Sequence, residues 1–165
     1  MEETIDAFRF IRKHKTHQPD LRKQLRYLNV WLDKDKMDSI LKNIISNALK
    51  YTPDGGNVHV FTSETEDTWS IEVKDTGIGI PTCEQKKLFR NYFRGSNVVN
   101  LKVTGSGIGL MLVYKLVKLH KGKIQIQSAE NQGTCVRITF PKGIAISIKQ
   151  NLSLPKHRMN VWRLL

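Results

Sequence analysis

The sequence contains no apolar run as long as the roughly 18 residues that a membrane-spanning helix needs. Its first residues, MEETIDAFRF, also lack the basic n-region and apolar core of a secretory signal peptide. These absences exclude a spanning helix and an export signal of the usual kind within these residues. We therefore expect a soluble, cytoplasmic segment that makes no membrane contact; any inner-membrane anchor of a longer protein would lie outside it.

Cysteine is scarce. The two cysteines, Cys83 and Cys135, form no CxxC pair and have no cluster of histidines beside them in the sequence. A zinc site of the usual spacing is therefore excluded, and a disulfide is disfavoured inside a cell. We expect two ordinary thiols.

Acidic residues are too few to balance the basic ones: 27 Lys and Arg against 15 Asp and Glu give a net charge of +12. A strongly basic domain often binds nucleic acid. Here the basic residues gather at the two ends, in RKHKTHQPDLRKQLR and PKHRMNVWR, which is typical of solvated surfaces and linkers. No nucleic acid is expected as a partner, and nucleic-acid binding stays the weaker alternative. The length of 165 residues suits one globular domain.

The first 30 residues have no clear period. TIDAFRFI is compatible with an edge strand or a short helix, and LRKQLRYL predicts a helix leading into a strand that ends in VWLD. A clear helix follows, with Asp33 or Asp35 as its N-cap and the PDGG turn at 53–56 as its end. Its apolar residues recur at helical spacing: Met37, Ile40, Leu41, Ile44, Ile45, Ala48 and Leu49.

The rest of the chain alternates strands and one further helix. NVHVFTS and TWSIEVKD predict antiparallel strands, and apolar residues from Ile108 to Leu119 predict a helix that stops at Gly122. KIQIQS and TCVRITF predict two more strands around a turn at 131–133, and AISIK is a weak strand. The pattern indicates an α+β fold in two layers, with one mostly antiparallel sheet covered on one face by helices.

Three polar residues follow one edge of the first helix. Asn43, Asn47 and Lys50 lie in a narrow stripe beside the apolar face, because successive residues turn by about 100°. An amide oxygen suits Mg²⁺, and a lysine one turn on can meet a phosphate. A plain polar solvent face is the alternative for this stripe.

The stretch DTGIGIP begins with a carboxylate in an unusual place. By parity Asp75 shares a strand face with three apolar residues, Trp69, Ile71 and Val73. A carboxylate that faces a pocket accepts a hydrogen bond from a donor such as the adenine amine, and Gly77 and Gly79 let a ligand come close. A tight turn with a capping aspartate is the alternative.

A second glycine-rich stretch, GSGIGL at 105–110, opens the second helix. Free N–H groups at a helix N-terminus form an anion site. The stretch matches neither a P-loop, which needs GK[ST], nor a Rossmann turn, which follows a strand. Alone it is weak support for a phosphate site.

The order of motifs is more specific than any one of them. NxxxNAxKYT, DxGxGIP, LFxxYFRG, GxGIGL and a Gly–Thr before a strand occur in succession between about residues 28 and 141. This order resembles the catalytic and ATP-binding domain of sensor histidine kinases, in the ATPase superfamily shared with gyrase B and the heat-shock chaperone. The resemblance implies a Bergerat-type two-layer α/β sandwich with a flexible ATP lid, and it implies ATP and Mg²⁺ as cofactors.

The resemblance also implies roles for single residues. Asn47 becomes the Mg²⁺ ligand, Asn43 its support, and Lys50 a phosphate contact. Tyr51 would lie against the nucleoside, and Asp75 would read the adenine amine with help from Thr134. The glycine-rich stretches supply the rest of the predicted nucleotide site: Gly77, Gly79, Ile80, Gly105, Gly107, Ile108, Gly109 and Leu110.

The lid implied by the resemblance covers about residues 82–104. Leu88, Phe89 and Phe93 are expected to anchor it by packing, and Arg94 is expected to act as a catalytic cation near the phosphates. Because the far end of this segment is polar and has little apolar anchoring, we expect it to be poorly ordered without nucleotide.

One position separates the branches of the superfamily. Gyrase-type members carry a glutamate base one turn before the metal asparagine, where this chain has Asn43, and an amide cannot take a proton from water at neutral pH. Slow hydrolysis and transfer to another acceptor are therefore expected. His14, His17, His59, His120 and His157 all lie outside an HExxRTP-like box, and His120 is expected to be structural.

The expected enzyme is therefore a protein-histidine kinase domain whose acceptor is elsewhere. Its expected partners are a dimerisation and phosphoacceptor helical domain, upstream or on another protein, and the receiver domain of a response regulator. The predicted domains are an N-terminal segment at 1–27, the catalytic domain at 28–142 and an extension or linker at 143–165. A nucleotide-sensing module without phosphotransfer and a serine kinase of the anti-sigma type stay as alternatives.

Overall fold

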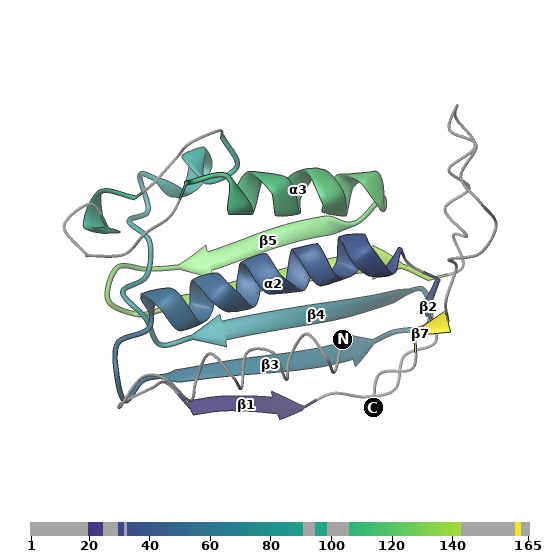
Figure 1. Ribbon diagram of the computed structural model, residues 1–165, viewed down its shortest axis with the longest axis horizontal. Coiled ribbons are helices and arrows are strands. Elements are labelled where there is room, and N and C mark those ends of the chain that lie inside the picture. The colour runs from purple at the N-terminus through teal and green to yellow at the C-terminus, as the bar shows by residue number, and fades with distance from the viewer. Residues whose placement is uncertain are drawn as a thin grey trace.

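A computed structural model describes residues 20–24, 30–31, 33–90, 95–98, 106–142 and 161–162. The predictions for TIDAFRFI and AISIK concern residues outside this description. Two helices, α2 (Lys34–Tyr51) and α3 (Gly109–Leu119), lie side by side over one face of a five-stranded sheet (Figure 1). None of the described helices is both long and apolar enough to cross a membrane.

The sheet has the order β1-β3-β4-β6-β5. Its strands are β1 (Asp20–Gln24), β3 (Asn57–Glu64), β4 (Thr68–Asp75), β5 (Lys123–Ser128) and β6 (Thr134–Pro141). β1 runs parallel to β3, and the other three pairings are antiparallel. The predicted two-layer fold with a mixed, mostly antiparallel sheet covered on one face is confirmed.

The helix predicted over LRKQLRYL is wrong in its first part. Asp20–Gln24 is the edge strand β1, in register with Asn57–Phe61 of β3. A free sheet edge satisfies the backbone N–H and C=O groups of this segment, and such tertiary pairing overrides a weak helical pattern. The domain boundary at residue 28 stays a prediction, although β1 precedes it.

The strand expected to end in VWLD is short. β2 (Val30–Trp31) pairs with β7 (Val161–Trp162) in a separate antiparallel pair, so part of the predicted C-terminal extension returns to the start of the domain. Two short 3₁₀ turns, η1 (Gln85–Lys87) and η2 (Ser96–Val98), lie in the segment between β4 and α3.

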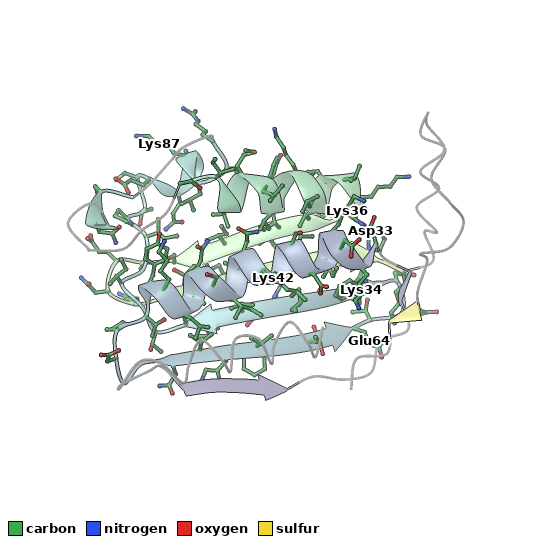
Figure 2. All side chains as sticks on the ribbon, viewed as in Figure 1. Asp33, Lys34, Lys36, Lys42, Glu64 and Lys87 are labelled. Atoms are coloured by element: carbon green, nitrogen blue, oxygen red, sulfur yellow. The ribbon has the colours of Figure 1, made fainter. Side chains whose placement is uncertain are left out.

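Helix α2 begins after Asp33, one of the two N-cap residues predicted from the sequence. Asp33 is the N-cap: its carboxylate accepts a hydrogen bond from the Lys36 N–H at 3.1 Å and forms an ion pair with the Lys36 ammonium at the same end of the helix (Figure 2). The helix ends just before Pro53, where the Thr52 hydroxyl donates a hydrogen bond to the Ala48 carbonyl at 2.6 Å.

Helix α3 ends differently from the prediction. The left-handed residue is Lys121, with φ of 53°, and not Gly122. The N–H groups of Lys121 and Gly122 donate to the Lys118 and Val117 carbonyls, both at 2.9 Å, which is a Schellman motif. Gly122 is needed for space instead, because a Cβ there would lie 2.8 Å from the Phe140 ring.

The core lies between α2, α3 and the covered face of the sheet. Trp69 of β4 stacks on Phe140 of β6 with ring centroids 4.8 Å apart, and both are fully buried. The row Trp69, Ile71, Val73 is continued by Asp75, which is 7% exposed, so the face predicted by parity is confirmed. The inward row of β4 therefore ends in a carboxylate at the rim of the core.

Candidate functional site

A cavity of about 270 Å³ opens where α2, α3 and the ends of β4, β5 and β6 meet. Eleven residues predicted from the sequence line it: Asn43, Asn47, Lys50, Tyr51, Asp75, Gly79, Ile80, Gly107, Gly109, Leu110 and Thr134. The lining omits Gly77 and Ile108, while Arg94, Gly105 and Phe93 lie outside the described residues. The roles assigned to these residues stay predictions.

The Asp75 carboxylate forms one wall of the cavity. Its Oδ1 accepts hydrogen bonds from the Gly77 N–H at 2.9 Å and the Thr134 N–H at 3.1 Å. Within the described part of the chain, Oδ2 has no such donor. Gly77 therefore acts on the site through Asp75, and one carboxylate oxygen is held in place while the other is available to a ligand.

Burial raises the pKa of the Asp75 carboxyl above its ordinary value of 3.8, and the two backbone N–H donors oppose this rise. A buried acceptor with an unused oxygen discriminates strongly between ligands, because a ligand without a donor leaves that oxygen unpaired.

Two glycines allow the loops beside Asp75 to approach each other more closely than any side chain would permit. A Cβ on Gly133, whose φ is 80°, would lie 2.0 Å from the Asp75 carbonyl oxygen. A Cβ on Gly79, whose φ is 64°, would lie 1.8 Å from the Ala129 carbonyl oxygen. Both positions require glycine for conformation and for space, and together they fix the β4 end against the β5–β6 turn.

The polar stripe of α2 faces the cavity. The Asn43 amide nitrogen donates to the Ser39 carbonyl at 2.8 Å, and its oxygen lies against Gly109, where a Cβ would be only 2.5 Å away. The Asn47 amide has no hydrogen-bond partner among the described residues and lines the cavity. The Lys50 ammonium lies 5.2 Å from the centre of the Tyr51 ring.

The N-terminus of α3 meets the same cavity. Its N-cap, Ile108, supplies no side-chain hydrogen bond, so this residue does not cap the first N–H groups of the helix. Asn43 fills the space beside Gly109, which brings α2 and α3 into close approach at this end. Because residues 107 and 109 are glycines, no side chain at these positions covers the backbone that lines the cavity. Exposed backbone N–H groups at a helix N-terminus suit an anion.

The described part of the predicted lid is tied to the site by side chains. Gln85 donates to the carbonyls of Ile80, at 3.2 Å, and Ser128, at 2.7 Å. Asn97 donates to the Gly79 carbonyl at 2.9 Å and lines the cavity. The expectation that the lid is poorly ordered without nucleotide stays a prediction.

Lid residue Phe89 packs against Tyr114 of α3, with ring centroids 4.9 Å apart. This contact agrees with the packing role expected for it.

Seven lining residues were not assigned to the site from the sequence: Ile78, Leu88, Gly95, Asn97, Ser106, Ile126 and Val136. Strand parity could have found Val136, because it shares a face with Thr134. Ile126 alternates with outward-facing glutamines on β5 and had the same signal. No pattern in the sequence indicates Asn97, since its contact with Gly79 joins residues 18 positions apart.

The described residues hold no cluster of three or more His, Cys, Asp or Glu side chains that would bind a metal by themselves. His120 is the buried C-cap residue of α3, where its Nδ1 lies 2.8 Å from the Leu116 carbonyl oxygen and its ring meets Phe140 edge-on. His59 stacks on Phe61, on β3 and on the sheet face opposite the buried row. Neither histidine lines the cavity.

Comparison with protein families gives a match to the model described as "Histidine kinase-, DNA gyrase B-, and HSP90-like ATPase", over residues 32–144. The sensor histidine kinase WalK of Bacillus subtilis is 42% identical over 118 residues. That alignment covers 70% of this chain and 19% of WalK, so the chain spans about a fifth of this relative's length.

Solved structures share the fold. The mycobacterial sensor histidine kinase MprB superposes with a TM-score of 0.66 at 26% identity, over 86% of this chain and 94% of that one. The catalytic domain of histidine kinase ThkA, in a nucleotide-free form, superposes with a TM-score of 0.70 at 22% identity, over 86% and 90% of the two chains.

Proposed function

The chain belongs to the family of histidine kinase-, DNA gyrase B- and HSP90-like ATPases, and from this membership we propose that it is the ATP-binding catalytic domain of a sensor histidine kinase. It binds Mg-ATP and donates the γ-phosphoryl group to a histidine on a separate dimerisation and phosphoacceptor domain. The activity serves two-component signal transduction.

One observation carries this proposal: one cavity combines a buried acceptor, polar groups of two helices and apolar side chains. We assign Asp75 and Thr134 to the base end of the ligand, and Asn47, Lys50 and the α3 N-terminus to its phosphate end. Apolar side chains line the same cavity, namely Ile78, Ile80, Leu88, Leu110, Ile126 and Val136. This combination suits a flat, amine-bearing base that carries a phosphate chain.

The residues present also fit Mg²⁺ in the form in which nucleotides carry it. Asn47 is a neutral oxygen ligand with no other partner among the described residues. Mg²⁺ is usually held by one or two protein ligands together with phosphate oxygens and water, so a dedicated cluster of carboxylates is not needed. When bound, the ion neutralises charge on the phosphate oxygens.

The identity of residue 43 favours transfer over hydrolysis. Asn43 occupies the position of the glutamate base in gyrase-type members, and its amide nitrogen is already committed to the Ser39 carbonyl. Without a carboxylate at position 43 to take a proton from water, we expect transfer of the γ-phosphoryl group to a nucleophile from another domain. An imidazole nitrogen of the partner's histidine forms the new bond to phosphorus, and ADP leaves.

Three further assignments belong to the proposal. The partners are the phosphoacceptor helices, on the same or another protein, and a response-regulator receiver domain. Arg94 supplies a lid cation near the phosphates. The domain works in the cytoplasm.

Changing Asp75 to Asn tests the base end. The substitution keeps the shape but places a donor where the ligand amine needs an acceptor, so we expect the affinity for Mg-ATP to fall about 30-fold or more. Isothermal calorimetry measures it. Glu72→Gln is the matched control, because it makes the same chemical change on the opposite face of the same strand. Equal ATP affinity in the Asp75→Asn variant would remove Asp75 from the site.

Phosphotransfer separates the proposal from its alternatives. The chain is incubated with γ-labelled Mg-ATP and a helical phosphoacceptor fragment from a histidine kinase of high similarity. We expect an acid-labile, alkali-stable label on the fragment. An acid-stable label would indicate a serine kinase, and ATP binding without any label on several such fragments would indicate a nucleotide-sensing module.

A further inference from the structure

Ser128 lies at the end of β5, directly opposite Thr134 in the register of β5 and β6. Its hydroxyl oxygen has three neighbours at hydrogen-bond distance. The Ile80 N–H donates to it at 2.9 Å, the Gly133 carbonyl lies 2.8 Å away, and the Thr134 hydroxyl lies 2.9 Å away. Ser128 does not line the cavity, so it contacts the site only through these neighbours.

The direction of these hydrogen bonds follows from the number of protons. A serine hydroxyl has one proton and two lone pairs. The Gly133 carbonyl can only accept, so it takes the Ser128 proton, while the Ile80 N–H uses one lone pair. The second lone pair faces Thr134, which must then donate its own proton.

The opposite arrangement is less favourable. If Ser128 donated to Thr134, the buried Gly133 carbonyl would lose the Ser128 donor, and a buried carbonyl without a donor is costly. The Thr134 proton therefore points away from the cavity, toward Ser128. Only lone pairs of the Thr134 hydroxyl remain for a ligand.

We propose that Ser128 is a positioning residue that sets base specificity, by holding the Thr134 hydroxyl as a hydrogen-bond acceptor toward the cavity. The base end then presents two acceptors, Oδ2 of Asp75 and the hydroxyl oxygen of Thr134. Such a pair favours a base with an exocyclic amine and disfavours a base with a carbonyl at the same position. This inference rests on the proposed function, because it concerns the same nucleotide site.

The test compares ATP with purine riboside triphosphate, which lacks the adenine amine and keeps the neighbouring ring nitrogen unprotonated. In the Ser128→Ala variant the Thr134 hydroxyl is free to turn and donate. We expect the preference for ATP, measured as the ratio of the two dissociation constants, to fall about tenfold. Calorimetry or displacement of a fluorescent nucleotide measures both ligands on the same preparation.

Two further variants exclude a general structural effect. Ser70→Ala is the matched control, because Ser70 and Thr139 form a similar hydroxyl pair, at 2.8 Å, on the opposite face of the sheet, and its preference for ATP should match the wild type. In a Thr134→Val background, adding Ser128→Ala should leave the ratio unchanged, because no hydroxyl remains to be oriented. A ratio that falls equally in both backgrounds would contradict the inference.

Thr134→Val also gives a test that does not depend on the folding of the Ser128→Ala variant. If Thr134 accepts from the base amine, its loss weakens ATP binding more than the binding of purine riboside triphosphate, and the ratio falls. A ratio that does not fall would show that Thr134 does not accept from the amine and would overturn the inference. Unchanged preference in a folded Ser128→Ala variant would also overturn it while leaving ATP binding intact, whereas a wild-type chain that binds no ATP would overturn the proposed function as well.

Discussion

The groups that we propose for the two ends of the nucleotide differ in their contacts. At the proposed base end, Oδ1 of Asp75 has two N–H donors and the Ser128 hydroxyl has three neighbours, while Oδ2 of Asp75 has no donor among the described residues. At the proposed phosphate end, Asn47 has no hydrogen-bond partner within the described part of the chain, and Ile108, the N-cap of α3, forms no side-chain hydrogen bond.

This difference agrees with the part of the ligand that we propose for each end. A base has a fixed pattern of donors and acceptors, and strand register can hold complementary groups in advance at little entropic cost on binding. A phosphate chain with its metal and water is variable, so groups without partners can adapt to it. We therefore expect substitutions at the base end to change specificity and those at the phosphate end to change metal dependence.

The largest effect is expected from Gly133→Ala. The new Cβ would lie 2.0 Å from the Asp75 carbonyl oxygen in a residue with φ of 80°, so the β4 end and the β5–β6 turn must separate. We expect the free energy of unfolding to fall by more than about 3 kcal/mol and ATP binding to be lost. Denaturant melts and calorimetry measure the two quantities.

Gly55 provides a matched control for that prediction. It has the same φ of 80°, but a Cβ there would meet nothing within 4 Å. Gly55→Ala should therefore cost only the conformational term, about 1 kcal/mol, and leave ATP affinity unchanged. If both substitutions lowered the free energy of unfolding and the ATP affinity equally, the close approach of Gly133 to Asp75 would not organise the proposed base end.

A smaller and more selective effect is expected from Asn47→Ala. The variant loses the proposed metal ligand, so ATP affinity with Mg²⁺ should fall about tenfold while affinity in the presence of a chelator changes less than about twofold. Calorimetry with and without Mg²⁺ measures the difference. Ser46→Ala, at the exposed neighbouring position of α2, is the control. An equal loss in both conditions would place Asn47 on the nucleotide rather than on its metal.

Much of the site could be predicted from the sequence, because the patterns that place these residues are local to one helix or one strand. Helical spacing placed Asn43, Asn47 and Lys50 on one stripe, and they do face one cavity. Strand parity alone placed Asp75 on the face of β4 that is buried. Each of these inferences needs only the period of one helix or one strand.

What could not be predicted depends on contacts between distant parts of the chain. Ser128 gave no signal beyond its place at the end of a strand, since its role comes from pairing with Thr134 and from the Ile80 N–H 48 residues away. β1 was predicted as helix because only its partner β3 makes it a strand. The sequence predicts Gly122 as the helix stop because the left-handed position is usually glycine, but in the structure that residue is Lys121.

The smallest expected effect is a pH dependence that belongs to the base end alone. Burial raises the pKa of Asp75, so between its ordinary value of 3.8 and the raised value the folded state binds more protons than the unfolded chain. Stability therefore falls as pH rises through this window. The Asp75→Asn variant cannot titrate at this position and should gain stability relative to the wild type over the same range.

ATP affinity should respond in the opposite direction, since only the ionised carboxylate presents an acceptor at both oxygens. As pH falls through the raised pKa of Asp75, the wild type should lose affinity more steeply than the Asp75→Asn variant, while the phosphates of ATP titrate equally in both experiments. Asn47→Ala should keep the wild-type slope, because no titrating group is removed. Parallel slopes for all three proteins would mean that the charge of Asp75 does not contribute to base recognition, and that the two ends of the cavity do not differ in the way proposed.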